Sequence, residues 1–143
     1  MKLLIVSQYC WPEVFGINAL AQALAQRGVE VTVLTGQPNY PEGHIFPGYH
    51  AGGLSAEVHG AVEIQRLPLA PRGKGSGVRL ALNYLSFILS AGLLGPWVLR
   101  GRSFDAVLVY APSPLLQALP ARDADLRVRV HRLRDRAGVQ PAY

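Results

Sequence analysis

Residues 3–35 read LLIVSQYCWPEVFGINALAQALAQRGVEVTVLT, and their pattern indicates the fold class. It begins with a short apolar run without alternation, Leu3–Ser7, which is typical of a strand covered on both faces. After a loop with a proline and bulky aromatics, apolar residues recur at helical spacing over Ile17–Arg27. Gly28 ends that helix, and the β-branched residues of Val29–Thr35 predict a second strand. Strand, helix and strand form a βαβ unit, so we expect a parallel sheet with a right-handed crossover.

The rest of the chain supplies two further strands. Val62–Leu67 (VEIQRL) alternates as a half-exposed strand does, and Phe104–Tyr110 (FDAVLVY) has the pattern of a buried one. Residues 36–60 are rich in Gly, Pro, Asn, Tyr and His, which predicts a long connection of a functional or mobile kind. A further helix is expected to begin at Ser113–Leu119. The sequence thus predicts an α/β domain with a parallel sheet of about four strands and helices on both faces.

Residues 78–99, VRLALNYLSFILSAGLLGPWVL, are the longest apolar segment. About 20 apolar residues are enough to span a bilayer. The basic residues on both sides favour no topology, and polar or helix-breaking residues interrupt the segment: Asn83, Ser86, Ser90, Gly92, Gly95 and Pro96. Our first interpretation is a core helix between two strands, the second a helix on an anionic membrane surface, and the third a true span.

Charge and composition bound the function classes. The 143 residues suffice for one domain, and the net charge of +5 at a pI near 9.8 suggests nucleic acid or anionic membrane as a partner. However, residues 1–120 carry eight Lys and Arg against six Asp and Glu, whereas the last 23 carry six Arg against three Asp. Most of the excess lies in a tail without interleaved aromatics, so we expect no nucleic-acid partner.

Metal, thiol and dinucleotide chemistry are not indicated. The histidines (His44, His50, His59 and His131) are dispersed, and solvation or capping accounts for the isolated carboxylates of Glu13, Glu42 and Asp105. The single cysteine, Cys10, fits a reducing cytoplasm and has no catalytic partner, so we expect a buried or loop thiol. The opening apolar run is too short for a signal peptide, which predicts a cytoplasmic protein. There is no GxGxxG motif, so NAD binding or another dinucleotide fold is not expected.

Four segments, in order, resemble the N-terminal domain of family 4 glycosyltransferases of the GT-B type. They are QYCWPEVFGINALAQALAQRGVEVTVLTG, GQPNYPEGHIFPGY, LNYLSFILSAGLLGPW and FDAVLVYAPSPLLQALPA. The second is similar to a loop of members that build lipid-linked exopolysaccharide and O-antigen repeat units. The resemblance covers residues 1–120. It implies the N-terminal half of a GT-B fold, an incomplete Rossmann-like parallel sheet.

In such enzymes the N-terminal domain binds the acceptor, often a polyprenyl-diphosphate-linked sugar at the membrane face. The second domain binds the sugar nucleotide, usually without an essential metal. The resemblance therefore implies a lipid-linked or saccharide acceptor, a sugar-nucleotide co-substrate and no cofactor bound by residues 1–120. It implies a role in cell-surface polysaccharide synthesis, without identifying catalytic residues, and no transfer by this polypeptide alone.

The positions that match the family's loop motifs are expected to line the acceptor cleft. They fall in three loops, each following a predicted strand: Pro12, Glu13, Gly16 and Asn18, then Asn39 and Tyr40, then Tyr110, Pro112 and Ser113. We expect them to face the second domain, because ligands of open α/β sheets bind beyond the carboxyl ends of the strands.

Residues 121–143 (ARDADLRVRVHRLRDRAGVQPAY) match neither the family nor the pattern of a core element. We therefore divide the chain at residue 120, and hypothesise that the tail is translated in a shifted frame or comes from a truncated gene. The alternative function is a membrane-surface or interaction module without catalysis. That module would be built around residues 78–102 and make peripheral contact with the inner face of the plasma membrane, with the tail touching anionic lipid.

Overall fold

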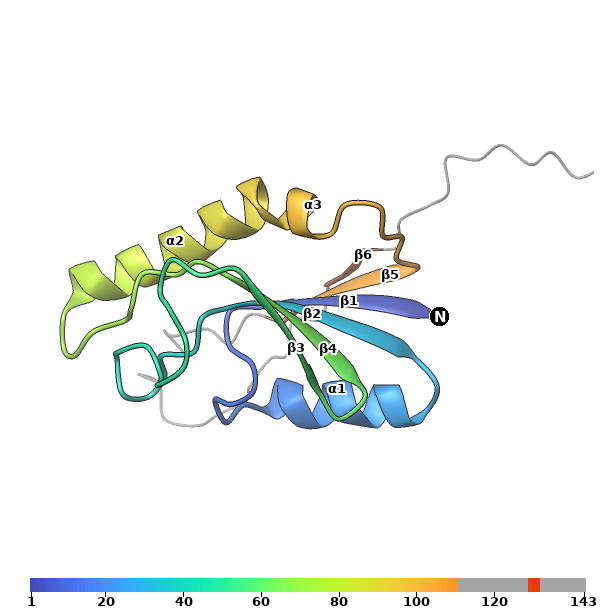
Figure 1. The fold of residues 1–143 in the computed structure, drawn as a ribbon. Helices are drawn as coiled ribbons and strands as arrows, with labels where there is room; N and C mark the ends of the chain where they lie inside the picture. Colours follow the sequence, from blue (N-terminus) through green and yellow to red (C-terminus); the bar gives the residue numbers. More distant parts are fainter. Residues whose placement is uncertain (111–128, 132–143) are drawn as a thin grey trace, which may run out of the picture.

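In the computed structural model, which describes residues 1–110 and 129–131, six strands form one sheet of order β3-β4-β2-β1-β5-β6 (Figure 1). The strands are β1 Lys2–Ser7, β2 Glu30–Gly36, β3 Ser55–His59, β4 Val62–Leu67, β5 Ala106–Tyr110 and β6 Arg129–His131. The helices of this part of the chain are α1 Gly16–Gln26, α2 Gly77–Leu93 and α3 Gly95–Val98.

The central four strands, β4-β2-β1-β5, run parallel, as the sequence predicts. Their observed bounds lie within two residues of the predicted ones, because each strand has a continuous apolar or alternating pattern. The βαβ unit over β1, α1 and β2 is confirmed. The chain is therefore an α/β protein with a mostly parallel sheet.

Both edge strands are antiparallel, so the expectation of a purely parallel sheet is wrong. β3 lies inside the region predicted to be one long connection, and it forms a hairpin with β4. Gly60 lies in the two-residue turn of that hairpin at a φ of 62°, a conformation that favours glycine. At the other edge, the backbone of Arg129–His131 pairs with β5, so the tail does contain one sheet element. The helix expected over Ser113–Leu119 lies outside the described residues.

The two faces of the sheet carry separate apolar clusters. Leu3 and Ile5 of β1 face α1, together with alternate residues of β2 and β4. Leu4 faces the opposite way, toward Leu34 and the α2–α3 side. This follows from the period of two along a strand, and Figure 1 shows the helices on opposite faces of the sheet. Helices on both faces are therefore confirmed.

α2 packs with its polar side chains toward the protein. Only Asn83 and Phe87 of this helix are buried. Ser86 Oγ accepts a hydrogen bond from the backbone N–H of Ala70 (2.9 Å), and Ser90 Oγ donates one to the carbonyl of Pro68 (2.7 Å). The helix covers the sheet, but the prediction of an apolar core helix misses its orientation.

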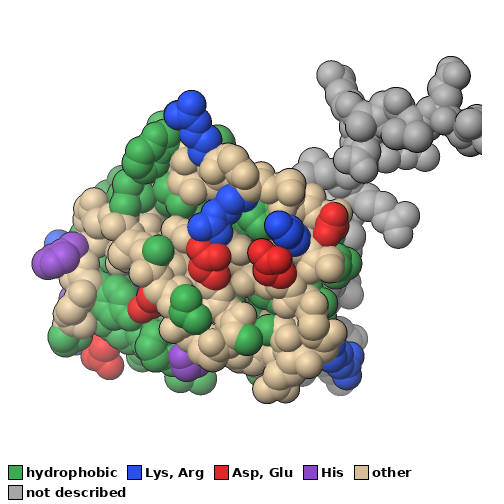
Figure 2. Space-filling view, turned by 45° about the vertical axis from the view of Figure 1, so that its right-hand side comes forward, with side chains coloured by type: hydrophobic (Ala, Val, Ile, Leu, Met, Phe, Trp, Pro, Cys, Tyr) green, Lys and Arg blue, Asp and Glu red, His purple; other side chains and the backbone are tan. Residues whose placement is uncertain are grey.

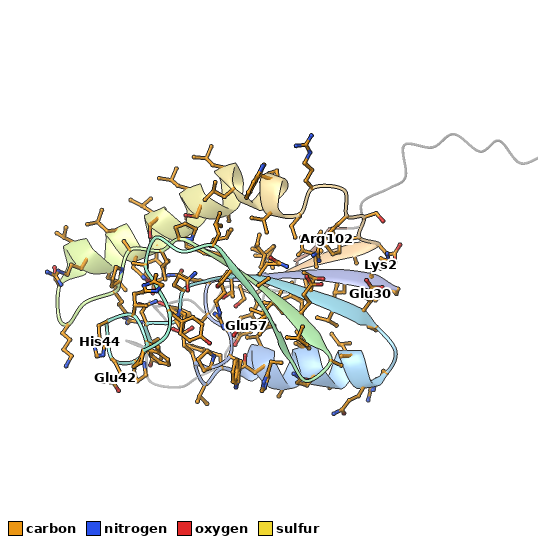
Figure 3. The ribbon with its side chains drawn as sticks, viewed as in Figure 1. Lys2, Glu30, Glu42, His44, Glu57 and Arg102 are labelled. Atoms are coloured by element: carbon orange, nitrogen blue, oxygen red, sulfur yellow. The ribbon has the colours of Figure 1, made fainter. Side chains whose placement is uncertain are left out.

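Exposed large apolar residues form a stripe on the outer side of α2. In Figure 3, side chains on that side of the helix point away from the sheet. Hydrophobic side chains gather over α2 at the upper left of Figure 2. The stripe consists of Val78, Leu82, Leu85, Ile88, Leu89 and Leu93, each between 52% and 76% exposed. Within residues 1–110 and 129–131, no helix has the length and apolar character needed to cross a membrane.

The orientation of α2 predicts opposite outcomes for two adjacent substitutions. Phe87 is 8% exposed and Ile88 is 63% exposed. We expect Phe87→Ala to lower the free energy of unfolding by about 3 kcal/mol, because it leaves a cavity against the sheet. Ile88→Ala should change it by less than about 0.5 kcal/mol. Urea unfolding of the full chain measures both values, and equal losses would mean that α2 packs through its apolar side.

Candidate functional site

The carboxyl ends of the parallel strands meet at one edge of the sheet, at the left of Figure 1. Three loops gather there: residues 8–15 after β1, residues 37–54 after β2 and residues 68–76 after β4. We call them the carboxyl-edge loops. Because ligands of open α/β sheets bind at this edge, it is the first place to look for a site.

Glu13 joins the first two carboxyl-edge loops. It is 2% exposed, so it is neither isolated nor solvated as the sequence predicted. Its Oε1 accepts hydrogen bonds from the backbone N–H groups of Asn39 (2.8 Å) and Tyr40 (2.7 Å), and Oε2 accepts one from Cys10 (3.3 Å). Burial raises the pKa of this carboxyl to about 6, although the three N–H groups act in the opposite direction. With its oxygens occupied, Glu13 serves to position the loops.

Asn18 and Asn39 also hold backbone in place. The side chain of Asn18 accepts from the N–H of Trp11 (2.8 Å) and donates to the carbonyl of Glu13 (2.6 Å), which fixes the first loop on α1. Asn39 is fully buried, donates to the carbonyl of Gln37 (3.0 Å) and accepts from the N–H of Arg72 (3.0 Å). Both predicted site residues therefore build the wall of the candidate cleft.

Asn83 connects α2 to the same wall, which the sequence did not reveal. Its Oδ1 accepts from Gln8 Nε2 (2.6 Å) and the Tyr9 hydroxyl (3.2 Å), and its Nδ2 donates to the carbonyl of Ala70 (2.7 Å). The sequence feature that could have identified this contact is an asparagine within an otherwise apolar helix. From the sequence alone, Asn83 indicates only that the helix is unsuited to span a membrane.

Arg66 is the other residue that sequence reasoning missed. Its side chain is fully buried, and its Nε donates to Glu57 Oε1 at 2.5 Å. Nη1 donates to the carbonyl of Gly36 (3.1 Å) and Nη2 to the carbonyl of Trp11. The guanidinium carbon lies 5.0 Å from the ring centroid of Tyr49. The sequence feature that could have identified Arg66 is its position in β4. Val62 and Ile64, four and two residues before it, lie on the same face of the strand and are buried.

Tyr40 and Arg72 are only partly buried at this edge. The ring of Tyr40 packs against Phe15, with 5.1 Å between centroids, and the Arg72 guanidinium lies 5.1 Å from the Tyr40 ring. Within residues 1–110, Arg72 forms no ion pair with a carboxylate. These two side chains can therefore meet a ligand, unlike Glu13 and Asn39.

Beside Arg72, a glycine-rich turn encloses a hollow of about 210 Å³ at the start of α2. Its lining is Arg72, Gly73, Gly75, Ser76, Gly77 and Leu80. The turn is held to the second loop by a hydrogen bond from the N–H of Gly73 to the carbonyl of Gly43 (2.7 Å). Gly43 has a φ of 80°, and a Cβ there would lie 2.3 Å from the Gly73 oxygen, so this close approach requires glycine.

Of the remaining predicted site residues, three lie in the described part of the chain and two do not. A Cβ built on Gly16 would lie 3.8 Å from the hydroxyl of Tyr110, so these two positions face each other across the edge. Pro12 is half-buried in the first loop. Pro112 and Ser113 lie outside the described residues.

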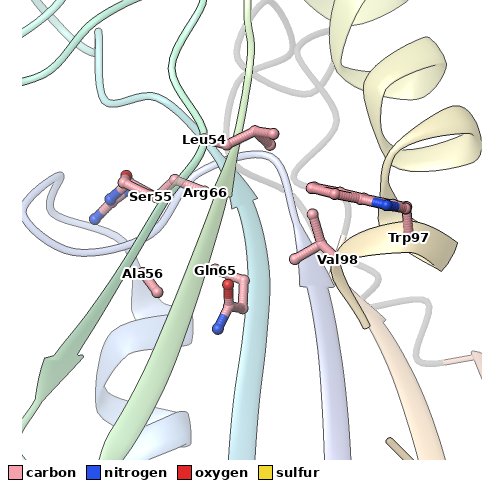
Figure 4. A pocket seen from close by; sticks show the side chains of 7 residues that line it. All are labelled: Leu54, Ser55, Ala56, Gln65, Arg66, Trp97 and Val98. Atoms are coloured by element: carbon pink, nitrogen blue, oxygen red, sulfur yellow. The ribbon is translucent and has the colours of Figure 1, made fainter. Parts of the chain in front are cut away.

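A second hollow, of about 320 Å³, lies between the β3–β4 hairpin and α3 (Figure 4). It is lined by Leu54, Ser55, Ala56, Gln65, Arg66, Trp97 and Val98. None of the predicted site residues contributes to it, and the Arg66 side chain is engaged with Glu57. We therefore place the candidate site at the carboxyl edge.

Two observations on residues 1–110 concern possible metal ligands and the single thiol. That part of the chain has no cluster of three His, Cys, Asp or Glu suited to a metal ion. Cys10 is buried, as expected, and its burial raises the thiol pKa to about 11. The thiol is thus protonated at neutral pH and is a poor nucleophile.

No family model matches this sequence, and no curated protein is significantly similar to it. The function is therefore inferred from the motifs of the sequence and from the geometry of the carboxyl edge.

The raised pKa of Glu13 predicts a stability that falls with rising pH. The folded state binds the Glu13 proton more tightly than the unfolded chain does. The contribution of this proton to the free energy of unfolding is therefore complete below about pH 4.5 and is lost as the pH rises through about 6. A difference of this size is worth about 2 kcal/mol. Urea unfolding between these pH values should show this dependence in the wild type and its loss in Glu13→Gln. An unchanged slope in the variant would contradict it.

Arg66→Lys should destabilise the fold by about 2–4 kcal/mol, because one ammonium cannot reach Glu57 and two separate carbonyls. Arg102→Lys is the matched control, since Arg102 pairs with Glu63 at 2.7 Å on the surface. The control should change the free energy of unfolding by less than about 1 kcal/mol. Similar losses in both variants would remove the special role of Arg66.

Proposed function

We propose that this chain is the acceptor-side half of a sugar-nucleotide-dependent glycosyltransferase, with the Rossmann-like fold of the N-terminal half of the GT-B type. The observation that carries the proposal is the fixed wall at the carboxyl edge. There, Glu13, Asn39 and Asn83 join the three loops that follow β1, β2 and β4. Five of the positions that match the family's motifs lie within these loops or contact them directly: Pro12, Glu13, Asn18, Asn39 and Tyr40.

The groups that face outward suit a phosphorylated acceptor. The Arg72 guanidinium has no carboxylate partner in the described chain, and Ser76 and Gly77 at the start of α2 line the adjoining hollow. Guanidinium and helix-start N–H groups are the donors that proteins use for phosphate. The Tyr40 ring beside Arg72 is only partly buried, and its exposed part adds an aromatic surface for an apolar or sugar moiety. A lipid-linked diphosphate sugar combines these features.

The part of the reaction assigned to these residues is orientation. A rigid wall holds the acceptor hydroxyl in one place, which makes the attack effectively unimolecular. The charge that develops on the donor phosphates would be stabilised by groups of the donor-binding domain, with the sugar nucleotide as co-substrate. Glu13 is not assigned as a base, because its carboxylate already accepts three backbone hydrogen bonds.

Binding of a soluble acceptor analogue tests the proposal. We expect the full chain to bind a short-chain prenyl-diphosphate hexose, measured by isothermal titration calorimetry. Arg72→Ala should weaken binding about tenfold or more, because a charge-assisted hydrogen bond to phosphate is lost. Arg27→Ala removes the same charge from an exposed position at the end of α1, at the opposite edge of the sheet. It should change the affinity by less than about twofold.

Two results would contradict the proposal. One is the absence of binding by a wild-type chain whose fold is confirmed by circular dichroism, and this is also what a module without catalysis predicts. The other is an equal loss of affinity in Arg72→Ala and Arg27→Ala, which would indicate only a nonspecific attraction by net charge.

A further inference from the structure

The apolar stripe of α2 has no partner within the described chain. It follows the outer side of a 17-residue helix, and all six of its large side chains are more than half exposed. Trp97 of α3, 61% exposed, lies beyond its C-terminal end. A contiguous apolar surface of this kind marks a site of interaction with a protein or a membrane.

The hydrogen bonds on the inner side of α2 show that the apolar stripe cannot be the buried side of this helix. Asn83 is fully buried with four hydrogen-bond contacts, and Ser86 and Ser90 bond to the loop after β4. Rotating the helix to bury the stripe would break all of these bonds and leave buried polar groups unpaired. The outward orientation of the stripe is therefore fixed by the rest of the fold.

The charges of the segment that contains the stripe have one sign. No Asp or Glu occurs between residues 64 and 104, whereas this interval carries six Lys and Arg. Arg66 is buried and Arg102 is paired with Glu63, but Lys74 and Arg79 near the start of α2 and Arg100 after α3 are exposed. An apolar helix face flanked by exposed cations is the pattern of helices that lie in the interface of anionic membranes.

We propose that α2 and α3 dock this chain on the surface of an anionic bilayer, with the stripe among the acyl chains and Lys74, Arg79 and Arg100 among the headgroups. A tryptophan such as Trp97 is a preferred residue at that depth. A second copy of the chain fits less well, because two stripes in contact would bring two sets of cations together without a carboxylate between them.

The docked orientation has a consequence for the carboxyl edge. α2 begins at Gly77, directly after the glycine-rich turn, and Asn83 ties its first half to the carboxyl-edge loops. A helix lying flat on the membrane would therefore hold the hollow beside Arg72 at headgroup level. The docking itself is independent of the proposed acceptor binding, since it uses different side chains.

Vesicle flotation tests the docking with the full chain. We expect wild-type protein to float with phosphatidylcholine vesicles that contain about 30% phosphatidylglycerol, and to bind less well to pure phosphatidylcholine or at high salt. Leu85→Glu/Leu89→Glu should reduce binding to the anionic vesicles at least tenfold, because two carboxylates would enter the apolar layer. Both positions are exposed, so the variant should remain folded.

The matched control is Val14→Glu/Val58→Glu. It makes the same change of charge at two exposed valines outside the stripe, 91% and 71% exposed, and should alter binding by less than about threefold. An equal loss in both double variants, or full binding by Leu85→Glu/Leu89→Glu, would overturn the docking. A wild-type dimer that the stripe variant alone converts to monomer would assign the stripe to a second copy instead. The Leu85→Glu/Leu89→Glu variant should still bind the soluble acceptor analogue. A loss of vesicle binding with retained analogue binding shows that docking and acceptor binding are separate properties.

Discussion

The carboxyl edge depends on one buried cation. A guanidinium removed from water is costly unless its donors are all satisfied, and Arg66 meets this requirement with partners from separate segments. Glu57 belongs to β3, Gly36 to the end of β2, and Trp11 to the loop after β1. If β3 moved away the buried charge would lose its carboxylate, and if either other segment moved away a buried N–H donor would lose its acceptor. The hairpin β3–β4 and the first loop are thus fixed relative to each other by a single side chain.

Glu13 and Asn83 extend the same arrangement toward the surface. Each is a buried polar side chain whose partners are mainly backbone groups or side chains of the carboxyl-edge loops. Among the described residues, the only buried side-chain atom without a hydrogen bond is Oε1 of Gln37. A network this completely satisfied gives rigid walls, and rigid walls are what a site needs to hold a ligand in one orientation.

The sequence predicts well what depends on local periodicity. β1, β2, β4, β5 and α1 were predicted within two residues, because each follows its own pattern of apolar side chains. It predicts poorly what depends on distant partners. The buried side of α2 is decided by Asn83, whose partners Gln8 and Asn39 are 75 and 44 residues away, and apolar residues on most sides of the helix hide that choice. Likewise, the sequence motif predicts that Glu13 lines the acceptor cleft. Its role in holding the loops together becomes apparent only from its hydrogen bonds to the second loop.

The position of β1 has a consequence for the order in which the protein is made. β1 is the first strand of the chain, yet it lies between β2 and β5, and Lys2 bonds to Asp105 across 103 positions of sequence. One long side of β1 therefore stays open until Tyr110 has been synthesised. At about 5–20 residues per second, the ribosome needs roughly 4–15 s to extend the chain from the end of β2 to that point. During this interval the nascent sheet exposes an apolar strand edge, which is the template that chaperones protect and that aggregation exploits.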